Sequence, residues 1–204
     1  MRKITGIGTV ACAMLFASGA QAAMPADHAG EFMVRARAVH IGWQNSTNTT
    51  ALAGVGAANK TIPEVDLNYF FTPNIAAELV LTYPQKVTVD PNVGSLKALP
   101  PSLTLQYHFM PDSASFRPYI GAGINYTRFS SYSLGGGTLT GSSNSTGFAM
   151  QAGFDMPITD TMTFNVDVKK EYIKTDISAT ATGASAGTLK LDPVLLGVGL
   201  GWKF

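Results

Sequence analysis

Beyond its N-terminal segment the chain has no cysteine, few charges and no long apolar run. The single cysteine of the 204 residues is Cys12, so the rest of the chain offers neither disulfides nor thiolate metal ligands. Charged residues make up 13% of the sequence, about half the usual share of a soluble domain. No apolar stretch beyond the N-terminus approaches the ~18 residues of a membrane-spanning helix. The formal net charge of +1 comes without a run of basic residues, which argues against nucleic acid or an acidic membrane surface as partner.

The N-terminus has the pattern of a secretory signal peptide. A positive pair, Arg2 and Lys3, precedes a largely apolar stretch that ends in the small-x-small pattern Ala20-Gln21-Ala22. A membrane anchor is the alternative, but the apolar stretch is short for one. We predict that residues 1–22 are removed on export and that residues 23–204 form one domain.

The remaining sequence alternates apolar with polar or small residues, which is the period-2 pattern of β-strands. The apolar positions of eight such segments lie within residues 32–38, 65–71, 75–81, 103–109, 120–126, 148–154, 162–168 and 194–204. Short turns rich in Pro, Asn and Asp alternate with long polar connections at residues 45–59, 84–97, 130–145 and 179–188. An even number of strands with short turns at one end and long loops at the other is typical of outer-membrane barrels.

The apolar sets of these eight segments carry no charge, which favours a membrane barrel over a soluble sandwich or lipocalin-like barrel. An Arg or Lys that faces lipid at mid-bilayer costs about 2–4 kcal/mol. Aromatic residues also gather at the strand ends, as in the girdles of membrane barrels. The expected periplasmic girdle is Phe32, Phe71, Phe109, Phe154 and Trp202, and the expected outer girdle is Trp43, Tyr83, Tyr126 and Tyr172. We predict an all-β fold, an eight-stranded antiparallel transmembrane up-and-down β-barrel, surrounded by lipid of a Gram-negative outer membrane.

The opposite face of the strands carries charges, so these side chains should lie inside the barrel. Five positive and six negative groups share this face, a balance that favours mutual pairing over a selective ion ring. An eight-stranded barrel has room only for side chains or one small ligand. These residues either fill the lumen or line a narrow route. The candidate lumen-lining residues are Arg35, Arg37, Glu64, Asp66, Glu78, Gln106, His108, Arg117, Asp167 and Lys169.

Four stretches of the chain resemble the outer membrane protein W family. They are residues 63–74, 99–109, 116–126 and 191–193, and the similarity extends over essentially all of the chain after residue 22. The resemblance implies a barrel with an apolar cavity, which passes small hydrophobic molecules inward and releases them sideways through the wall. A lateral opening is then expected at Pro100, Pro101 and Pro118, because proline removes a hydrogen bond of the ladder. A strand start or barrel corner is the alternative explanation for these prolines.

The sequence therefore suggests a non-enzymatic, porin-like barrel that assists the passage of small hydrophobic molecules, without cofactor, metal or nucleic-acid partner. One alternative is an envelope barrel that acts through its outer loops. Another is a lipid-modifying barrel enzyme, in which His108 would meet a serine and a carboxylate. The last strand ends in an alternating apolar pattern with Trp202 and Phe204. We predict that these two residues are the signal read by the barrel-assembly machinery.

Overall fold

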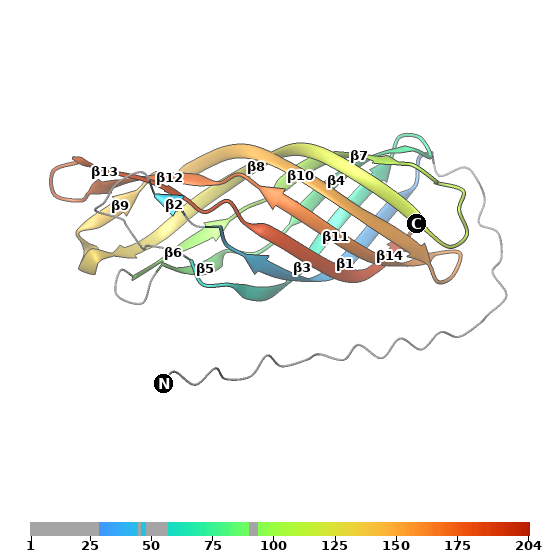
Figure 1. Ribbon diagram of the computed structural model, residues 1–204, viewed down its shortest axis with the longest axis horizontal. Coiled ribbons are helices and arrows are strands. Elements are labelled where there is room, and N and C mark those ends of the chain that lie inside the picture. Colours follow the sequence, from blue (N-terminus) through green and yellow to red (C-terminus); the bar gives the residue numbers. More distant parts are fainter. Residues whose placement is uncertain (1–28, 45, 48–56, 90–93) are drawn as a thin grey trace, which may run out of the picture.

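Eight long antiparallel strands form the body of the molecule in this computed structural model, which describes residues 29–44, 46–47, 57–89 and 94–204. The strands are β1 (Phe32–Gly42), β3 (Lys60–Phe70), β4 (Ile75–Leu81), β7 (Ser102–His108), β8 (Arg117–Leu134), β10 (Asn144–Pro157), β11 (Met162–Glu171) and β14 (Val194–Lys203). Figure 1 shows that they wind around one long axis. No helix among the described residues is long and apolar enough to cross a membrane. The predicted signal peptide, residues 1–22, lies outside the described residues and stays a prediction.

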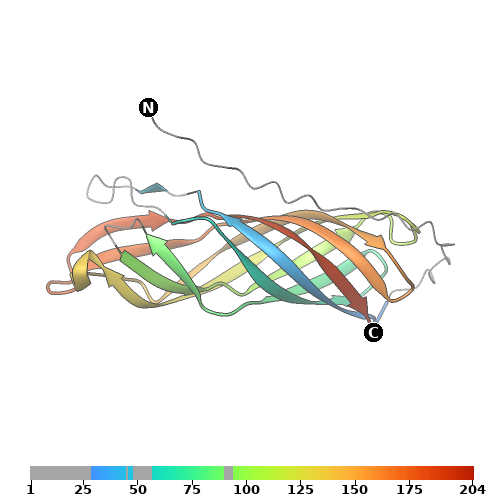
Figure 2. The ribbon, with the colours of Figure 1, turned by 90° about the horizontal axis from the view of Figure 1, so that it is seen from below.

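The barrel is closed by pairing of its first and last strands. β1 pairs with β14 from Met33–Lys203 to Gly42–Val194, and with β3 on its other side. The two strands run side by side in Figure 2, β1 in blue and β14 in red. Every other strand of the eight pairs with its neighbours in sequence order. The predicted eight-stranded antiparallel barrel is therefore confirmed.

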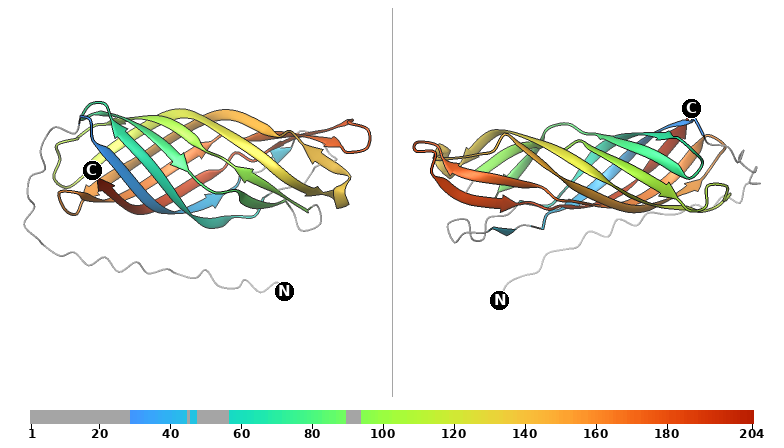
Figure 3. Two further views of the ribbon diagram at one scale, coloured as in Figure 1. Left: turned by 180° about the vertical axis from the view of Figure 1, so that it is seen from behind. Right: turned by 90° about the horizontal axis from the view of Figure 1, so that it is seen from above.

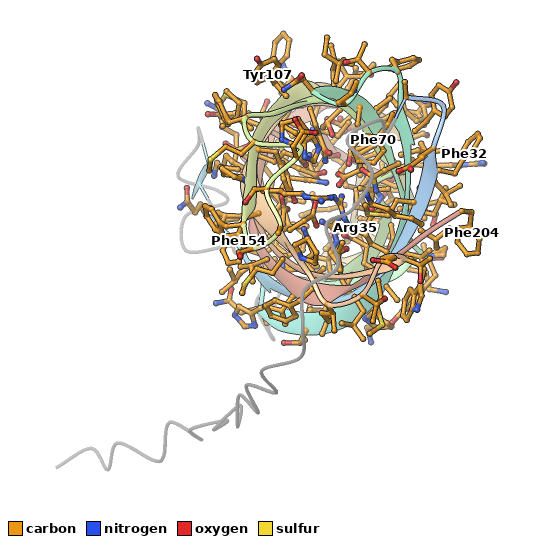
Figure 4. All side chains as sticks on the ribbon, turned by 90° about the vertical axis from the view of Figure 1, so that its right-hand side faces the viewer. Phe32, Arg35, Phe70, Tyr107, Phe154 and Phe204 are labelled. Carbon is orange, nitrogen blue, oxygen red and sulfur yellow. The ribbon has the colours of Figure 1, made fainter. Side chains whose placement is uncertain are left out.

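Side chains alternate between the two faces of the wall as the sequence predicts. In β1, Phe32 is 55% exposed whereas Arg35 is fully buried. Figure 4 looks along the barrel: Arg35 and Phe70 lie inside the ring of strands, and Phe32, Tyr107 and Phe154 lie outside it. The outward apolar sets carry no charge, so this surface suits contact with lipid rather than water.

The two ends of the barrel differ. One end, which we call the short-turn end, carries the turns at residues 71–74, 109–116 and 158–161 together with the C-terminus, at the right of Figure 1. The opposite end, the ribbon end, carries β5 (Gln85–Val89), β6 (Gly94–Leu99), the end of β8, the 3-10 turn Gly135–Gly137, β9 (Leu139–Gly141), β12 (Lys174–Ala179), β13 (Ser185–Lys190) and the short β2 (Ser46–Thr47).

The long connections at the ribbon end are largely strands, so the prediction of loops at residues 84–97, 130–145 and 179–188 is wrong. Figure 3 shows these strands extending the barrel wall beyond the eight main strands. The predicted loop at residues 45–59 lies mostly outside the described residues. Their Gly, Ser and Thr content made these segments look like loops, although each also has inward-facing apolar residues that pack together.

The apolar face turns inward in these extensions. Ile173 is buried and Lys174 is exposed, whereas the outward residues of β11 are apolar from Met162 to Val168. The outward side changes from apolar to polar just beyond Tyr83, Tyr126 and Tyr172, where the wall leaves lipid and meets water. The buried cluster inside the ribbon end is Ala57, Val87, Leu96, Ala98, Phe129, Leu134, Ile173, Ile177, Leu189 and Leu191.

The aromatic girdles occupy the predicted positions with one exception. Exposed girdle residues are Phe32, Phe71, Phe109 and Trp202 at the short-turn end and Tyr83, Tyr126 and Tyr172 near the ribbon end. Phe154 is half-buried and packs on Phe116, with ring centroids 5.0 Å apart. Trp43 packs instead against both buried clusters of the ribbon end. Its assignment to the girdle is wrong, because it continues the inward parity of Val39 and Ile41.

Candidate functional site

The half of the lumen nearer the short-turn end is filled by a network of ion pairs centred on Arg35, which is labelled in Figure 4. Its Nη2 lies 2.7 Å from Asp155 Oδ2, and its Nη1 lies 3.4 Å from Glu78 Oε2 and 3.6 Å from Asp66 Oδ1. Nη1 also donates a hydrogen bond of 3.0 Å to Asn68 Oδ1. These partners stand on β3, β4 and β10, so one guanidinium bridges the lumen.

Arg37 makes a second centre of the same network, two residues further along β1. Its Nη2 lies 2.7 Å from Glu64 Oε1 and its Nε lies 3.0 Å from Asp66 Oδ2. Its Nη1 lies 3.6 Å from both Glu78 Oε2 and Asp167 Oδ1. Asp66 and Glu78 are thus each shared by two guanidinium groups, which is how buried carboxylates remain compensated.

Glycines on β14 make room for the two arginines. Arg35 stands opposite Gly201 and Arg37 opposite Gly199. A Cβ at Gly199 would lie 2.1 Å from the carbonyl oxygen of Ala36 and 2.7 Å from the Cα of Arg37. No side chain fits in that space. At these positions β14 therefore presents only its backbone to the lumen, and the side chains of Arg35 and Arg37 lie across it.

His108 lies towards the short-turn end, packed between two aromatic rings. The ring centroids of Phe70 and Tyr119 lie 5.2 Å and 5.0 Å from its own. His108 Nε2 is 3.1 Å from Gln106 Oε1, and the Tyr119 hydroxyl donates to Asp167 at 3.0 Å. The hydrogen-bond partner of this imidazole in the described chain is thus an amide, not the serine that a nucleophilic set requires.

All ten candidate lumen residues lie inside the barrel and are buried. Nine of them are joined by the contacts above or by two further ones, Lys169 to Glu78 and Gln106 to Glu78. Arg117 stands opposite Asp155 in the ladder of β8 and β10 at the short-turn end, and its Nε donates to the Ser113 carbonyl at 2.8 Å. Four members of the network were not among the candidates: Asn68, Tyr119, Asp155 and Asn165. Their inward parity is the signal that finds them.

Between the network and the ribbon end lies a narrow cavity with a mainly apolar lining. The lining residues are Ile41, Trp43, Ile62, Ala98, Pro100 and Leu195, with Glu64, Thr82, Gln85 and Glu171. The space holds about one or two water molecules, so a larger molecule enters only if side chains move. Trp43 Nε1 and Thr82 Oγ1 are buried there without a hydrogen-bond partner in the part of the chain that the structure describes.

The barrel wall is interrupted beside this cavity. The ladder between β4 and β7 ends at the pair Val80–Ser102, and pairing resumes only between β5 and β6. Within the described residues, no backbone hydrogen bond joins residues 81–84 to residues 99–101. At this point, therefore, the two described segments are not joined to each other by a backbone ladder.

Prolines account for part of the interruption. Pro84, Pro100 and Pro101 lie within it and have no N–H to donate to a ladder. Pro118 lies far from them, near the short-turn end of β8, where it pairs with Phe154 and its carbonyl accepts the N–H of Phe109. The structure thus brings Pro100 to the cavity, with Pro101 next to it in the chain, and separates Pro118 from both.

A groove on the outward face meets the cavity at the same place. It is lined by Pro63, Glu64, Val65, Leu81, Thr82 and Tyr83. Glu64 and Thr82 line both the outer groove and the inner cavity. The side chains of these two residues therefore separate the interior of the barrel from its outer surface.

Comparison with known proteins identifies relatives over nearly the whole chain. The model of the OmpW family matches residues 28–204. The outer-membrane protein y4mB of Sinorhizobium fredii is 38% identical over 183 residues, which cover 85% of this chain and 80% of that protein. Outer membrane protein W of Vibrio cholerae is 31% identical over 195 residues, covering 86% and 89%. The crystal structure of OprG from Pseudomonas aeruginosa matches with a TM-score of 0.71 at 28% identity, covering 87% of this chain and 97% of that one.

Proposed function

This chain belongs to the OmpW family of outer-membrane β-barrels, and we propose that it assists the entry of small hydrophobic molecules and releases them sideways through its wall. The observation that carries the proposal is the position of the ion-pair network. A molecule that enters the apolar cavity from the ribbon end meets a lumen filled by Arg35, Arg37 and their carboxylates. Beside the cavity, in contrast, the wall has no backbone pairing between residues 81–84 and 99–101.

The name of one relative supports an apolar solute. DoxH of a Pseudomonas strain is named a dibenzothiophene metabolism operon protein and is 30% identical to this chain over 113 residues. The match covers 55% of this chain and 53% of that protein. Dibenzothiophene is a flat, uncharged aromatic molecule, and a cavity lined by Ile41, Ile62 and Leu195 suits that chemistry.

The cavity must widen before such a molecule passes, and two of its side chains can move at low cost. A buried polar group that has no hydrogen bond loses none when it is displaced. Trp43 Nε1 and Thr82 Oγ1 are in that state. We therefore propose Thr82 and Pro100 as the edges of the lateral opening, with Pro101 beside them and Trp43 as the side chain that makes way.

A disulfide across the interruption tests this route. Cys12 is the single natural cysteine and lies in the predicted signal peptide, so two introduced cysteines have no competing thiol in the barrel. Thr82 and Pro100 both line the cavity, and they face each other if the register of Val80–Ser102 continues. We expect oxidised T82C/P100C to lower the initial uptake of labelled naphthalene to that of cells without the protein. Reduction should restore uptake.

The matched control joins the same two strands where their ladder is intact. Ala77 pairs with Leu105 on the outward face, so oxidised A77C/L105C should leave uptake unchanged. Unchanged uptake in oxidised T82C/P100C would contradict the lateral route while leaving transport itself in place. If the wild-type protein does not accelerate uptake at all, the transport proposal is wrong.

A second function, that of an envelope barrel acting through its outer end, is supported by the ribbons themselves. β12 and β13 form a paired ribbon with a buried apolar face. A segment that only connected two membrane strands would need neither the pairing nor the buried face. Shortening its tip at residues 180–184 should then weaken resistance of the cells to detergent without changing naphthalene uptake. Loss of uptake alone would favour the transport function.

A further inference from the structure

We propose that the ribbon end carries a binding surface for the phosphate groups of outer-leaflet lipids. The surface is a set of exposed cations on the outward face of five strands, which we call the basic belt. Its members are Lys86, Lys97, Arg128, Lys174 and Lys190. In Figure 1, β5, β6, β12 and β13 lie at the ribbon end, and β8 runs along the barrel into it.

The basic belt lies at the level where lipid headgroups are expected. Arg128 and Lys174 each come two residues after an outer-girdle tyrosine, and Lys86 comes three residues after Tyr83. At about 3.3 Å per residue, the cations lie roughly 7–10 Å further along their strands than the tyrosines. Tyrosine girdles mark the membrane–water interface, so the ammonium and guanidinium groups reach the layer that contains lipid phosphates.

Two pairs of lysines in the belt stand directly opposite each other. Lys86 pairs with Lys97 on β5 and β6, and Lys174 pairs with Lys190 on β12 and β13. Like charges in directly opposite positions destabilise a sheet. In the described part of the chain, the ion pairs are formed by other residues, and no carboxylate lies within 4.0 Å of these four ammonium groups. A bound anion would relieve the repulsion in each pair.

A groove in the outer wall identifies the anion as part of a lipid. The groove beside the second lysine pair is lined by Thr146, Gly147, Phe148, Tyr172, Ile173 and Asp192 together with Lys174 and Lys190. Phe148 is 71% exposed, on the membrane side of the lysines. A molecule that satisfies both parts of this groove has an acyl chain for the aromatic side and a phosphate for the lysines.

The carboxylates near the belt are engaged elsewhere. Asp176 accepts a hydrogen bond of 2.6 Å from a threonine hydroxyl, and Asp192 accepts a backbone N–H at 3.0 Å.

Exposed charges at the short-turn end are of the opposite sign and include Asp112 and Asp160. The absence of a basic run in the sequence argued against an acidic membrane surface. The proposal departs from that expectation, because the fold gathers single cations from separate segments of the chain.

Lipid retention measures the proposed binding. The folded protein is placed in phosphatidylcholine nanodiscs that contain a few per cent of bisphosphorylated lipid A, and bound lipid is counted by native mass spectrometry. We expect K174Q/K190Q to bind this lipid at least tenfold more weakly, since each cation near an anionic surface is worth about fivefold. The conservative variant K174R/K190R keeps both charges and should bind like the wild type.

Three outcomes would overturn the proposal. One is equal binding of lipid A from which both phosphates have been removed. Another is a K174Q/K190Q protein that retains the phosphorylated lipid as well as the wild type does. The third is inorganic phosphate that displaces the lipid at equal concentration, because the aromatic side of the groove would then contribute nothing.

Discussion

Replacing Arg35 with methionine tests whether the ion-pair network stabilises the barrel. Methionine has a similar length and fills similar space, so the change removes the charge and the hydrogen bonds rather than the volume. Glu78 keeps Lys169 and Arg37 as partners, and Asp66 keeps Arg37 at 3.0 Å. Asp155 instead loses its 2.7 Å ion pair and keeps only neutral or more distant neighbours.

The cost of R35M should therefore concentrate on one buried carboxylate. Removing one partner of a buried ion pair destabilises a protein by about 3–5 kcal/mol. Asn165 Nδ2 still donates to Asp155 Oδ1 at 2.9 Å, which favours the lower end of that range. The double variant R35M/D155N removes both charges of the pair and should recover ~1–3 kcal/mol of the loss. Arg35→Lys keeps the charge and should cost less than R35M.

Urea unfolding in lipid vesicles measures these differences. The chain has two tryptophans, Trp43 and Trp202, one inside the ribbon end and one on the lipid-facing surface. Their fluorescence reports unfolding at both ends of the barrel. A free energy of unfolding for R35M within about 0.5 kcal/mol of the wild type would refute the reasoning. So would a double variant that is no more stable than R35M.

Three further changes give separate tests. Gly199→Val should prevent stable closure of the barrel, because its side chain would overlap the Ala36 carbonyl; heat-modifiability on gels shows closure, and Gly197→Ala, whose Cβ has 3.5 Å of clearance, is the tolerated control. Trp43→Ala should widen the cavity and raise the initial uptake of labelled naphthalene, and unchanged uptake would show that this ring is no obstacle. Deleting Phe204 should lower the amount of protein in the outer-membrane fraction, measured by immunoblot; undiminished insertion would disprove its role as an assembly signal.

The sequence was sufficient to predict which side chains face lipid and which face the lumen, because lipid excludes charged side chains from the outward face. A charge on the outward face of β1 is expensive, so the alternation of Arg35 and Arg37 with small apolar residues assigns both faces at once. The same rule places Trp43, since it shares the odd-numbered inward positions of β1. Treating it as a girdle residue followed the preference of tryptophan for interfaces and ignored the parity.

The alternation of apolar and polar residues did not predict which carboxylate each arginine contacts inside the lumen. Arg35 binds Asp155, which is 120 positions away in the sequence, and several other carboxylates share the same face. Strand register and the space left by Gly199 and Gly201 decide which of them the guanidinium reaches. The ribbons escaped prediction for a different reason. Their alternation has the opposite phase to that of the membrane strands, so a search for outward apolar residues does not find them.

The location of the wall interruption follows from the demands of the bilayer on backbone polar groups. Within the hydrocarbon layer each unpaired N–H or C=O costs several kcal/mol, so a ladder must be continuous there. Residues 81–84 include Tyr83, the girdle residue at which the outward face changes from apolar to polar. At that level interfacial water can pair with the free backbone groups. On the proposed lateral route, the side exit therefore lies at the ribbon-end edge of the membrane, where Pro84, Pro100 and Pro101 interrupt the ladder.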